Sequence, residues 1–150
     1  MEAYQLKNRG LPHCEVRKNR AFDFFGIGEM DELEKNLAAY ARSQSIPYAF
    51  TLFSGAERIA PYARYNRGFV YVEEKYVVDM TKALGWKEVS SGANFTLMVP
   101  YYSDVIENPR EIAGAKVIDD FQLYLDLAGF KGRGEDAAQF ILEQRIKPIW

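Results

Sequence analysis

Apolar positions along the chain change their spacing several times, and these changes predict helices and strands in mixed order. One set recurs every three or four residues and would share one face of a helix over 31–44: Met30, Leu33, Leu37, Tyr40 and Ala41. Shorter runs rich in aromatic and β-branched residues are typical of strands. These runs cover residues 21–28, 46–53, 67–74, 86–90, 94–99 and 116–119.

Two signatures indicate where helices begin. Asp31 followed by Glu34, and Ser54 followed by Glu57, have the spacing of a capping box. In such a box the first side chain accepts a hydrogen bond from a backbone amide and the second reaches back. The first pair predicts the start of the amphipathic helix. The second pair predicts a short helix that Pro61 must end or kink, because proline lacks the amide donor.

The middle of the chain is predicted to continue with one more helix and a pair of strands. Residues 76–84 form a helical pattern that Gly85 closes. Strands 86–90 and 94–99 are expected to pair with each other across a Ser-Gly turn. Residues 101–115 contain proline and glycine, so we expect a long loop before the last strand.

A glycine cluster near the C-terminus resembles a phosphate-binding loop. It lies within "QLYLDLAGFKGRGEDAAQFIL" and comprises Gly129, Gly132 and Gly134 around Lys131 and Arg133. A Walker loop needs four residues between its glycines and a Lys-Ser/Thr pair, and a dinucleotide fingerprint needs a preceding strand, whereas this segment is helical in pattern. Glu135 and Asp136 would also repel a phosphate at the start of the second helix. We therefore interpret the cluster as the joint between two C-terminal helices.

Together these elements predict an α+β fold, with a single mixed sheet flanked by helices and two helices at the C-terminus. The chain has 150 residues, of which 48% are hydrophobic and 15% aromatic, enough for one buried core. Residues 1–20 carry Gly10 and Pro12 and show no periodicity, so we expect a basic arm or linker there. The globular domain is expected over residues 21–150.

Several kinds of chemical site are disfavoured by the residues available. With one Cys14 and one His13, the chain has no internal disulfide, too few soft ligands for zinc and no well-placed base for a nucleophilic triad. Asp119 and Asp120 would face opposite sides of a predicted strand and cannot chelate one metal ion. We expect Asp119, with Gln122, to cap the helix that follows. No metal site and no catalytic site are therefore predicted.

Charge and hydropathy indicate where the protein works. No apolar run approaches the roughly 20 residues of a membrane helix, and the N-terminus lacks the apolar core of a signal peptide, so we expect a soluble cytoplasmic protein. The net charge is −2. Basic and acidic residues alternate in blocks, and such blocks can give one basic face on an acidic protein.

One stretch has the outline of a nucleotidyltransferase core. A strand that ends in Ser54-Gly55 is followed by a short helix and by the strand over 67–74, where such enzymes present two metal-binding acids two residues apart. These two positions hold Tyr71 and Glu73. Since tyrosine cannot replace a carboxylate on magnesium, we expect at most a nucleotidyltransferase-like outline without catalytic acids.

Three segments carry a resemblance to a known family. They are "IPYAFTLFSGAERIAPYARYNRGFVYVEE", "SSGANFTLMVPYYSDVI" and "VIDDFQLYLDLAGFKGRGEDAAQFIL", and the last is the most specific. Over residues 22–144 the chain resembles the C-terminal domain of the AbiEi-type antitoxins. These are the transcriptional-regulator half of type IV (abortive infection) toxin-antitoxin systems.

The resemblance implies a noncatalytic regulatory domain without a cofactor. In such antitoxins a winged helix-turn-helix binds operator DNA, and the second domain is associated with neutralising a nucleotidyltransferase-type toxin and with assisting DNA binding. The implied partners are that toxin, as the protein or through its transcript level, and DNA through the full-length protein; an oligomer is compatible with this reading. The sequence begins in what resembles the linker after the winged helix, so we expect the DNA-reading helix to be missing.

Two sets of side chains are candidates for these contacts. The cations that could hold a DNA backbone are Arg17, Lys18, Arg20, Arg64, Arg67, Lys131 and Arg133. The tyrosines in predicted turns that suit a protein interface are Tyr62, Tyr65, Tyr101 and Tyr102. A cryptic nucleotidyltransferase-like enzyme and a structural dimerisation module are the alternative functions.

Overall fold

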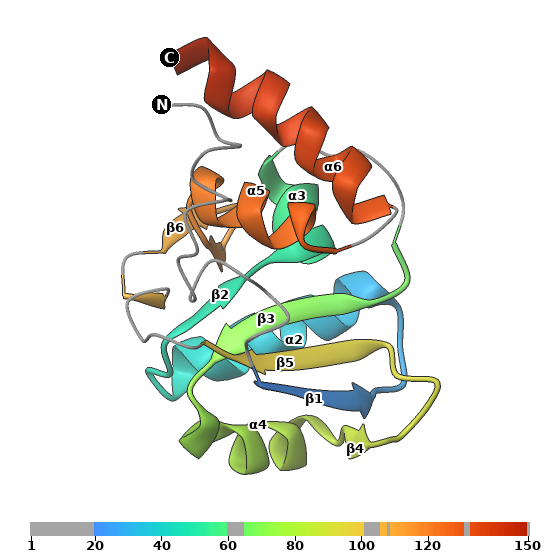
Figure 1. The fold of residues 1–150 in the computed structure, drawn as a ribbon. Coiled ribbons are helices and arrows are strands. Elements are labelled where there is room, and N and C mark those ends of the chain that lie inside the picture. The colour runs from blue at the N-terminus through green and yellow to red at the C-terminus, as the bar shows by residue number, and fades with distance from the viewer. Residues whose placement is uncertain (1–19, 60–64, 101–105, 108, 131–132, 150) are drawn as a thin grey trace.

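The computed structural model describes residues 20–59, 65–100, 106–107, 109–130 and 133–149 (Figure 1). The strands are β1 (Arg20–Phe25), β2 (Tyr48–Phe50), β3 (Gly68–Val72), β4 (Lys87–Glu88), β5 (Phe95–Val99), β6 (Arg110–Ile112) and β7 (Ala115–Val117). The helices are α2 (Met30–Ser43), α3 (Leu52–Ile59), α4 (Val77–Leu84), α5 (Asp120–Ala128) and α6 (Arg133–Ile141). Short helical turns cover Glu74–Tyr76, Leu142–Ile146 and Lys147–Ile149.

The strands of these described residues form one mixed sheet with the order β4-β1-β5-β3-β2-β7-β6. The pairs β3–β5 and β2–β7 are parallel, and the other neighbours are antiparallel. Two helices close the chain (Figure 1). The predicted α+β class, with a single mixed sheet and two C-terminal helices, is therefore confirmed. The nucleotidyltransferase-like outline is not.

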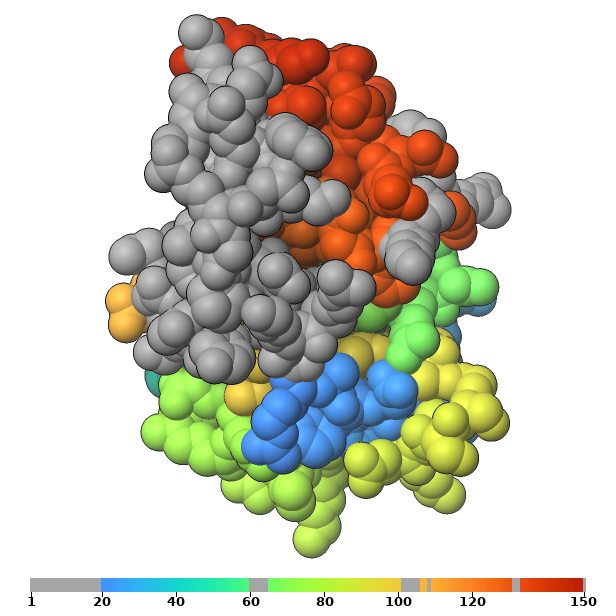
Figure 2. Space-filling model, in the orientation of Figure 1, coloured from blue at the N-terminus to red at the C-terminus, as the bar shows by residue number. Residues whose placement is uncertain are grey.

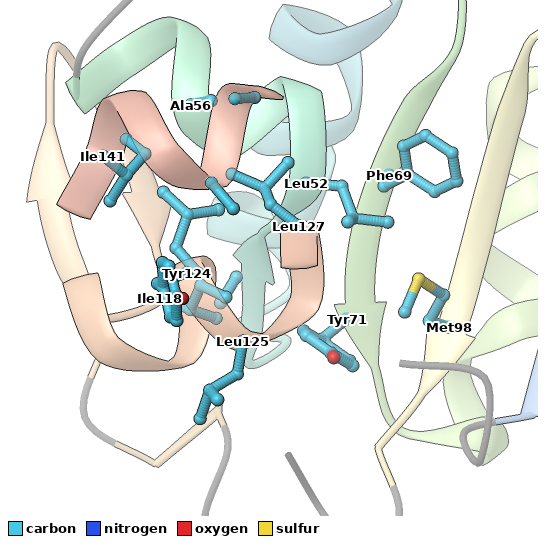
Figure 3. Close-up of a cluster of buried hydrophobic side chains, with 14 of the residues drawn as sticks. Leu52, Ala56, Phe69, Tyr71, Met98, Ile118, Tyr124, Leu125, Leu127 and Ile141 are labelled. Atoms are coloured by element: carbon cyan, nitrogen blue, oxygen red, sulfur yellow. The ribbon is translucent and has the colours of Figure 1, made fainter. Parts of the chain in front are cut away.

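Helices cover both faces of the sheet, and the sheet separates the hydrophobic core into two clusters. In β3, Phe69 and Tyr71 point to the cluster under α3, α5 and α6, whereas Val70 and Val72 point to the cluster under α2 and α4. This alternation is the two-residue period of a strand that is buried on both faces. Figure 3 shows the first cluster, with Leu127 of α5 beside Leu52 between Phe69 and Tyr71 of β3 on one side and Ile141 of α6 on the other.

Most predicted elements are present, but two predicted connections are wrong. The segments 86–90 and 94–99 do not form a hairpin, because β4 and β5 both pair with β1, on opposite edges, where Phe24 is opposite both Glu88 and Phe95. The predicted long loop contains β6, which forms an antiparallel hairpin with β7. Two residues with positive φ, Ala113 at 53° and Gly114 at 82°, make that tight turn.

Both predicted capping boxes are wrong as well. The N-cap of α2 is Glu29, without a side-chain hydrogen bond, and α3 begins at Leu52. Glu34 and Ser54 are instead buried, and Ser54 Oγ donates a hydrogen bond to Glu34 Oε2 at 2.5 Å. The predicted cap of α5 is confirmed, since Asp119 Oδ1 accepts from the amide of Gln122 at 2.8 Å. The Gln122 side chain itself turns into the core.

The glycine cluster is a joint between α5 and α6, as predicted. Gly129 is the C-cap of α5. A Cβ atom on Gly134 would lie 2.5 Å from Phe130 Cβ and 2.6 Å from the Leu127 carbonyl oxygen, closer than such atoms approach. Glycine at this position therefore lets α6 begin directly against the end of α5. Lys131 and Gly132 lie outside the described residues.

Candidate functional site

Aromatic side chains gather where the C-terminal helices meet the end of the sheet. Phe53 of α3 lies 5.5 Å from Phe130 and 6.5 Å from Tyr65, measured between ring centroids, and Phe69 of β3 lies 5.6 Å from Phe130. Aromatic pairs in such arrangements contribute about 0.5–1.5 kcal/mol each beyond burial. With two flanking guanidinium groups they form the arginine–aromatic surface: Phe53, Tyr65, Arg67, Phe69, Phe130 and Arg133.

The two arginines of this surface lie over its rings. The Arg133 guanidinium carbon is 5.6 Å from the Phe53 centroid, and that of Arg67 is 5.6 Å from the Phe69 centroid. Arg67 also donates to Asp23 Oδ1 at 2.6 Å and to Thr96 Oγ1 at 2.9 Å. Arg133, at the start of α6, is exposed. In Figure 2 the segment that leads into β3 (green) lies between the C-terminal helices (red) and β1 (blue).

Tyr65 is fixed at this surface by its hydroxyl group. The hydroxyl donates to the Glu34 carboxylate, at 2.8 Å from Oε2 and 3.0 Å from Oε1. Burial and the Glu34 charge raise the pKa of Tyr65, so the phenol stays neutral throughout the physiological range. One residue thus joins the arginine–aromatic surface to a buried carboxylate.

Glu34 is the polar node that ties α2 to α3. Besides Tyr65 and Ser54, it accepts from Arg58 Nη1 at 2.8 Å, and its side chain is only 3% exposed. Its sequence spacing, which suggests a cap, is also the spacing that places it on the buried face of α2 with Ala38 and Ala41. The position of Glu34 on this buried face indicates a contact with another element, and the interpretation of Glu34 as part of a cap missed this contact.

The structure brings together three of the predicted contact residues and separates a fourth. Tyr65, Arg67 and Arg133 belong to the arginine–aromatic surface. Arg20 does not, because it pairs with Glu74 and lies 5.4 Å from the Phe22 centroid, on the face of the sheet that α4 covers. The other candidates lie outside the described residues: Arg17, Lys18, Arg64, Lys131, Tyr62, Tyr101 and Tyr102.

The two positions that correspond to nucleotidyltransferase acids do not form a metal site among the described residues. Tyr71 is fully buried and donates to Asp126 Oδ2 at 2.7 Å. Glu73 lies just beyond the end of β3, with Lys75 Nζ 4.0 Å away. Nowhere in the described part of the chain do three or more metal-ligating side chains come together.

Asp126 is the centre of a second buried polar network. Its carboxyl group accepts from Thr51 Oγ1 at 2.6 Å, from Tyr71 and from Gln122 Nε2 at 2.9 Å. Burial raises the pKa of Asp126 to about 7, although these three donors lower it. With no exposed surface, the group cannot reach a substrate, so it links α5 to β3 and to Thr51, which directly follows β2.

Comparison with known proteins places the chain in a family. The family described as "Transcriptional regulator, AbiEi antitoxin, Type IV TA system" matches residues 17–147. No curated protein and no solved structure matches the chain significantly. No helix within the described residues has the length and apolar character needed to span a membrane. Because the match covers nearly all of the sequence, the chain belongs to the AbiEi antitoxin family of type IV toxin-antitoxin transcriptional regulators.

Proposed function

We propose that this chain is a noncatalytic regulatory domain that works in the cytoplasm. It neutralises a nucleotidyltransferase-type toxin of its toxin-antitoxin system and assists the binding of DNA. The observation that carries the proposal is the family match over residues 17–147. The arginine–aromatic surface supports it, because exposed arginine beside aromatic rings is typical of surfaces that contact other macromolecules.

Arg133 is the best residue with which to test the neutralising role. It is exposed at the start of α6, and its guanidinium lies over Phe53, where a partner could contact both groups. Arg133→Glu reverses the charge and removes the cation–π contact, worth about 0.5–1 kcal/mol at an exposed site, so the fold is expected to survive. Lys82→Glu, at an exposed position of α4 across the sheet, makes the same charge change away from the arginine–aromatic surface.

Coexpression with the toxin encoded beside the gene gives the measurement. The wild type and Lys82→Glu are expected to restore growth, and Arg133→Glu is expected to restore it less. Failure of the wild-type chain to relieve toxicity would exclude neutralisation by this domain. If both variants restored growth equally, the domain would still neutralise the toxin, but through residues outside the arginine–aromatic surface.

The DNA-assisting role makes a separate prediction about salt. If Arg133 holds a phosphate, its replacement by alanine should lower the slope of log affinity for duplex DNA against log salt by about one unit. Lys82→Ala is the matched control and should leave the slope unchanged. No binding of the wild type at low salt would remove DNA contact from the function of this domain.

A further inference from the structure

A groove runs along α2 and shares Tyr65 with the arginine–aromatic surface. It lies between α2, the end of α3 and the β6–β7 turn, and it has a volume of about 530 Å³. This volume is within the range of sites that hold small molecules, roughly 300–1,000 Å³. Arg58 and Tyr65 line one part of it, and Arg42 and Gly114 line another.

Arg58 is held so that one edge of its guanidinium stays available. Its Nη1 atom donates to both Glu34 Oε1, at 2.8 Å, and the Ser54 carbonyl oxygen, at 3.0 Å. The guanidinium carbon lies 4.5 Å from the Phe50 ring centroid, which fixes its plane. Nε and Nη2 have no hydrogen-bond partner among the described residues. These two N–H groups form the side of an arginine fork that binds two oxygens of a carboxylate or a phosphate.

Arg42 supplies a second positive charge to the same groove. Its Nη2 atom donates to the Gly114 carbonyl oxygen at 2.8 Å, and no carboxylate of the described residues lies within ion-pair distance. It is eight residues after Glu34 on α2, roughly 12 Å along the helix axis. Burial raises the pKa of Tyr48, and after the Lys116 amide, Arg42 and Arg58 are the groups that oppose this rise. Both charges therefore act on the same side of the sheet.

The acidic groups of the groove limit what it can hold. Glu34 is neutralised by Arg58 and also accepts from two hydroxyl groups. Asp31 pairs with Lys35 at 3.0 Å. Glu57 has no ion-pair partner in the described part of the chain, and it follows that a second anionic group beside Arg58 would be repelled. The arrangement suits a ligand with a single oxyanion.

We propose that this groove binds a small molecule through one carboxylate or phosphate group. The oxyanion accepts two hydrogen bonds from Nε and Nη2 of Arg58, and the charge of Arg42 attracts it. The uncharged remainder of the ligand lies along α2, where Ala38 and Ala39 leave room. Glu34 is a positioning residue, since it orients Arg58 without contacting the ligand. Apart from Tyr65, this site uses none of the residues of the arginine–aromatic surface.

Calorimetric titration of the purified chain tests the proposal with butyrate, inorganic phosphate and AMP as probes and adenosine as the uncharged control. At least one anionic probe is expected to bind at concentrations up to about 10 mM, and adenosine is not. Butyrate binding without AMP or phosphate binding would identify a carboxylate ligand, and the reverse would identify a phosphate. If none of the anions binds, or if adenosine binds as well as AMP, the proposal is wrong.

Two variants then connect binding to the named groups. Arg42→Gln, at an exposed position, and Arg58→Lys, which keeps the charge beside Glu34 but removes the fork, are each expected to weaken binding by about tenfold. Lys82→Gln is the control and should bind like the wild type. The Arg58 Nε–H signal in a nitrogen-correlated NMR spectrum should also move on binding. Unchanged affinity in both variants, or an unmoved Nε–H signal, would overturn the proposal whatever the toxin assay gives.

Discussion

Replacement of Asp126 by asparagine tests whether one buried carboxyl group sets how stability depends on pH. Asp126 has no exposed surface, and the groups that donate hydrogen bonds to it, from Thr51, Tyr71 and Gln122, are all uncharged. Burial raises its pKa from 3.8 to about 7. The folded protein therefore keeps this group neutral over a pH range in which the unfolded chain ionises it.

The size and sign of the effect follow from this pKa. A rise of roughly 3 units corresponds to about 4 kcal/mol in the free energy of unfolding. Because the folded pKa is the higher one, the contribution is fully present below pH 3.8 and is lost as the pH rises to about 7. Asp126→Asn removes this loss. The free energy of unfolding of the variant is thus expected to rise relative to that of the wild type by up to about 4 kcal/mol between about pH 4 and pH 8.

Urea unfolding of the two proteins across this pH range gives the measurement. The fluorescence of the buried Trp86 reports the transition. Asp136→Asn, at an exposed position on α6, is the matched control and should change the pH profile little. A difference between wild type and Asp126→Asn that stays constant from low to high pH would refute the reasoning, because it would mean that the buried carboxyl group does not titrate anomalously.

Three further substitutions have expected outcomes in the same unfolding assay. Gly134→Ala forces α6 away from α5 and should lower the free energy of unfolding by about 1–3 kcal/mol, whereas Gln139→Ala on the exposed side of α6 should change it by less than about 0.5 kcal/mol. Tyr65→Phe keeps the ring but removes the donor to Glu34, with an expected loss of about 1–3 kcal/mol. Glu34→Gln leaves the largely buried Arg58 without its counter-charge and should lower stability by about 3–5 kcal/mol; an unchanged midpoint would contradict this.

Local patterns predicted the elements well because their causes lie within a few residues. The apolar spacing of α2 reports which face is buried, and Gly85 ends α4 at a φ of 75°, as its position after the helix predicts. The β1 strand shows the limit of such patterns. Its alternation identifies a strand but does not say which partners occupy its two edges, so the sequence order of β4 and β5 suggested a hairpin that does not form.

The candidate site was harder to predict, since its contacts join residues that are distant in the sequence. The structure places Tyr65, Arg67 and Arg133 on a shared surface, but no local pattern in the sequence connects Phe53 to Phe130. The spacing of Asp31 and Glu34 led to the wrong prediction of a capping box. A glutamate three positions after an aspartate is equally compatible with a helix cap and with a tertiary hydrogen bond. Only the packing of α3 against α2 decides between them.

The two buried carboxyl groups show why the kind of partner, and not burial alone, decides the effect of a substitution. Glu34 has a guanidinium 2.8 Å away, so its charge is compensated and an amide in its place leaves Arg58 uncompensated. Asp126 has hydroxyl and amide donors, which hydrogen-bond to a carboxyl group without balancing its charge. The same change from acid to amide should therefore destabilise the protein at Glu34 and stabilise it at Asp126 above neutral pH.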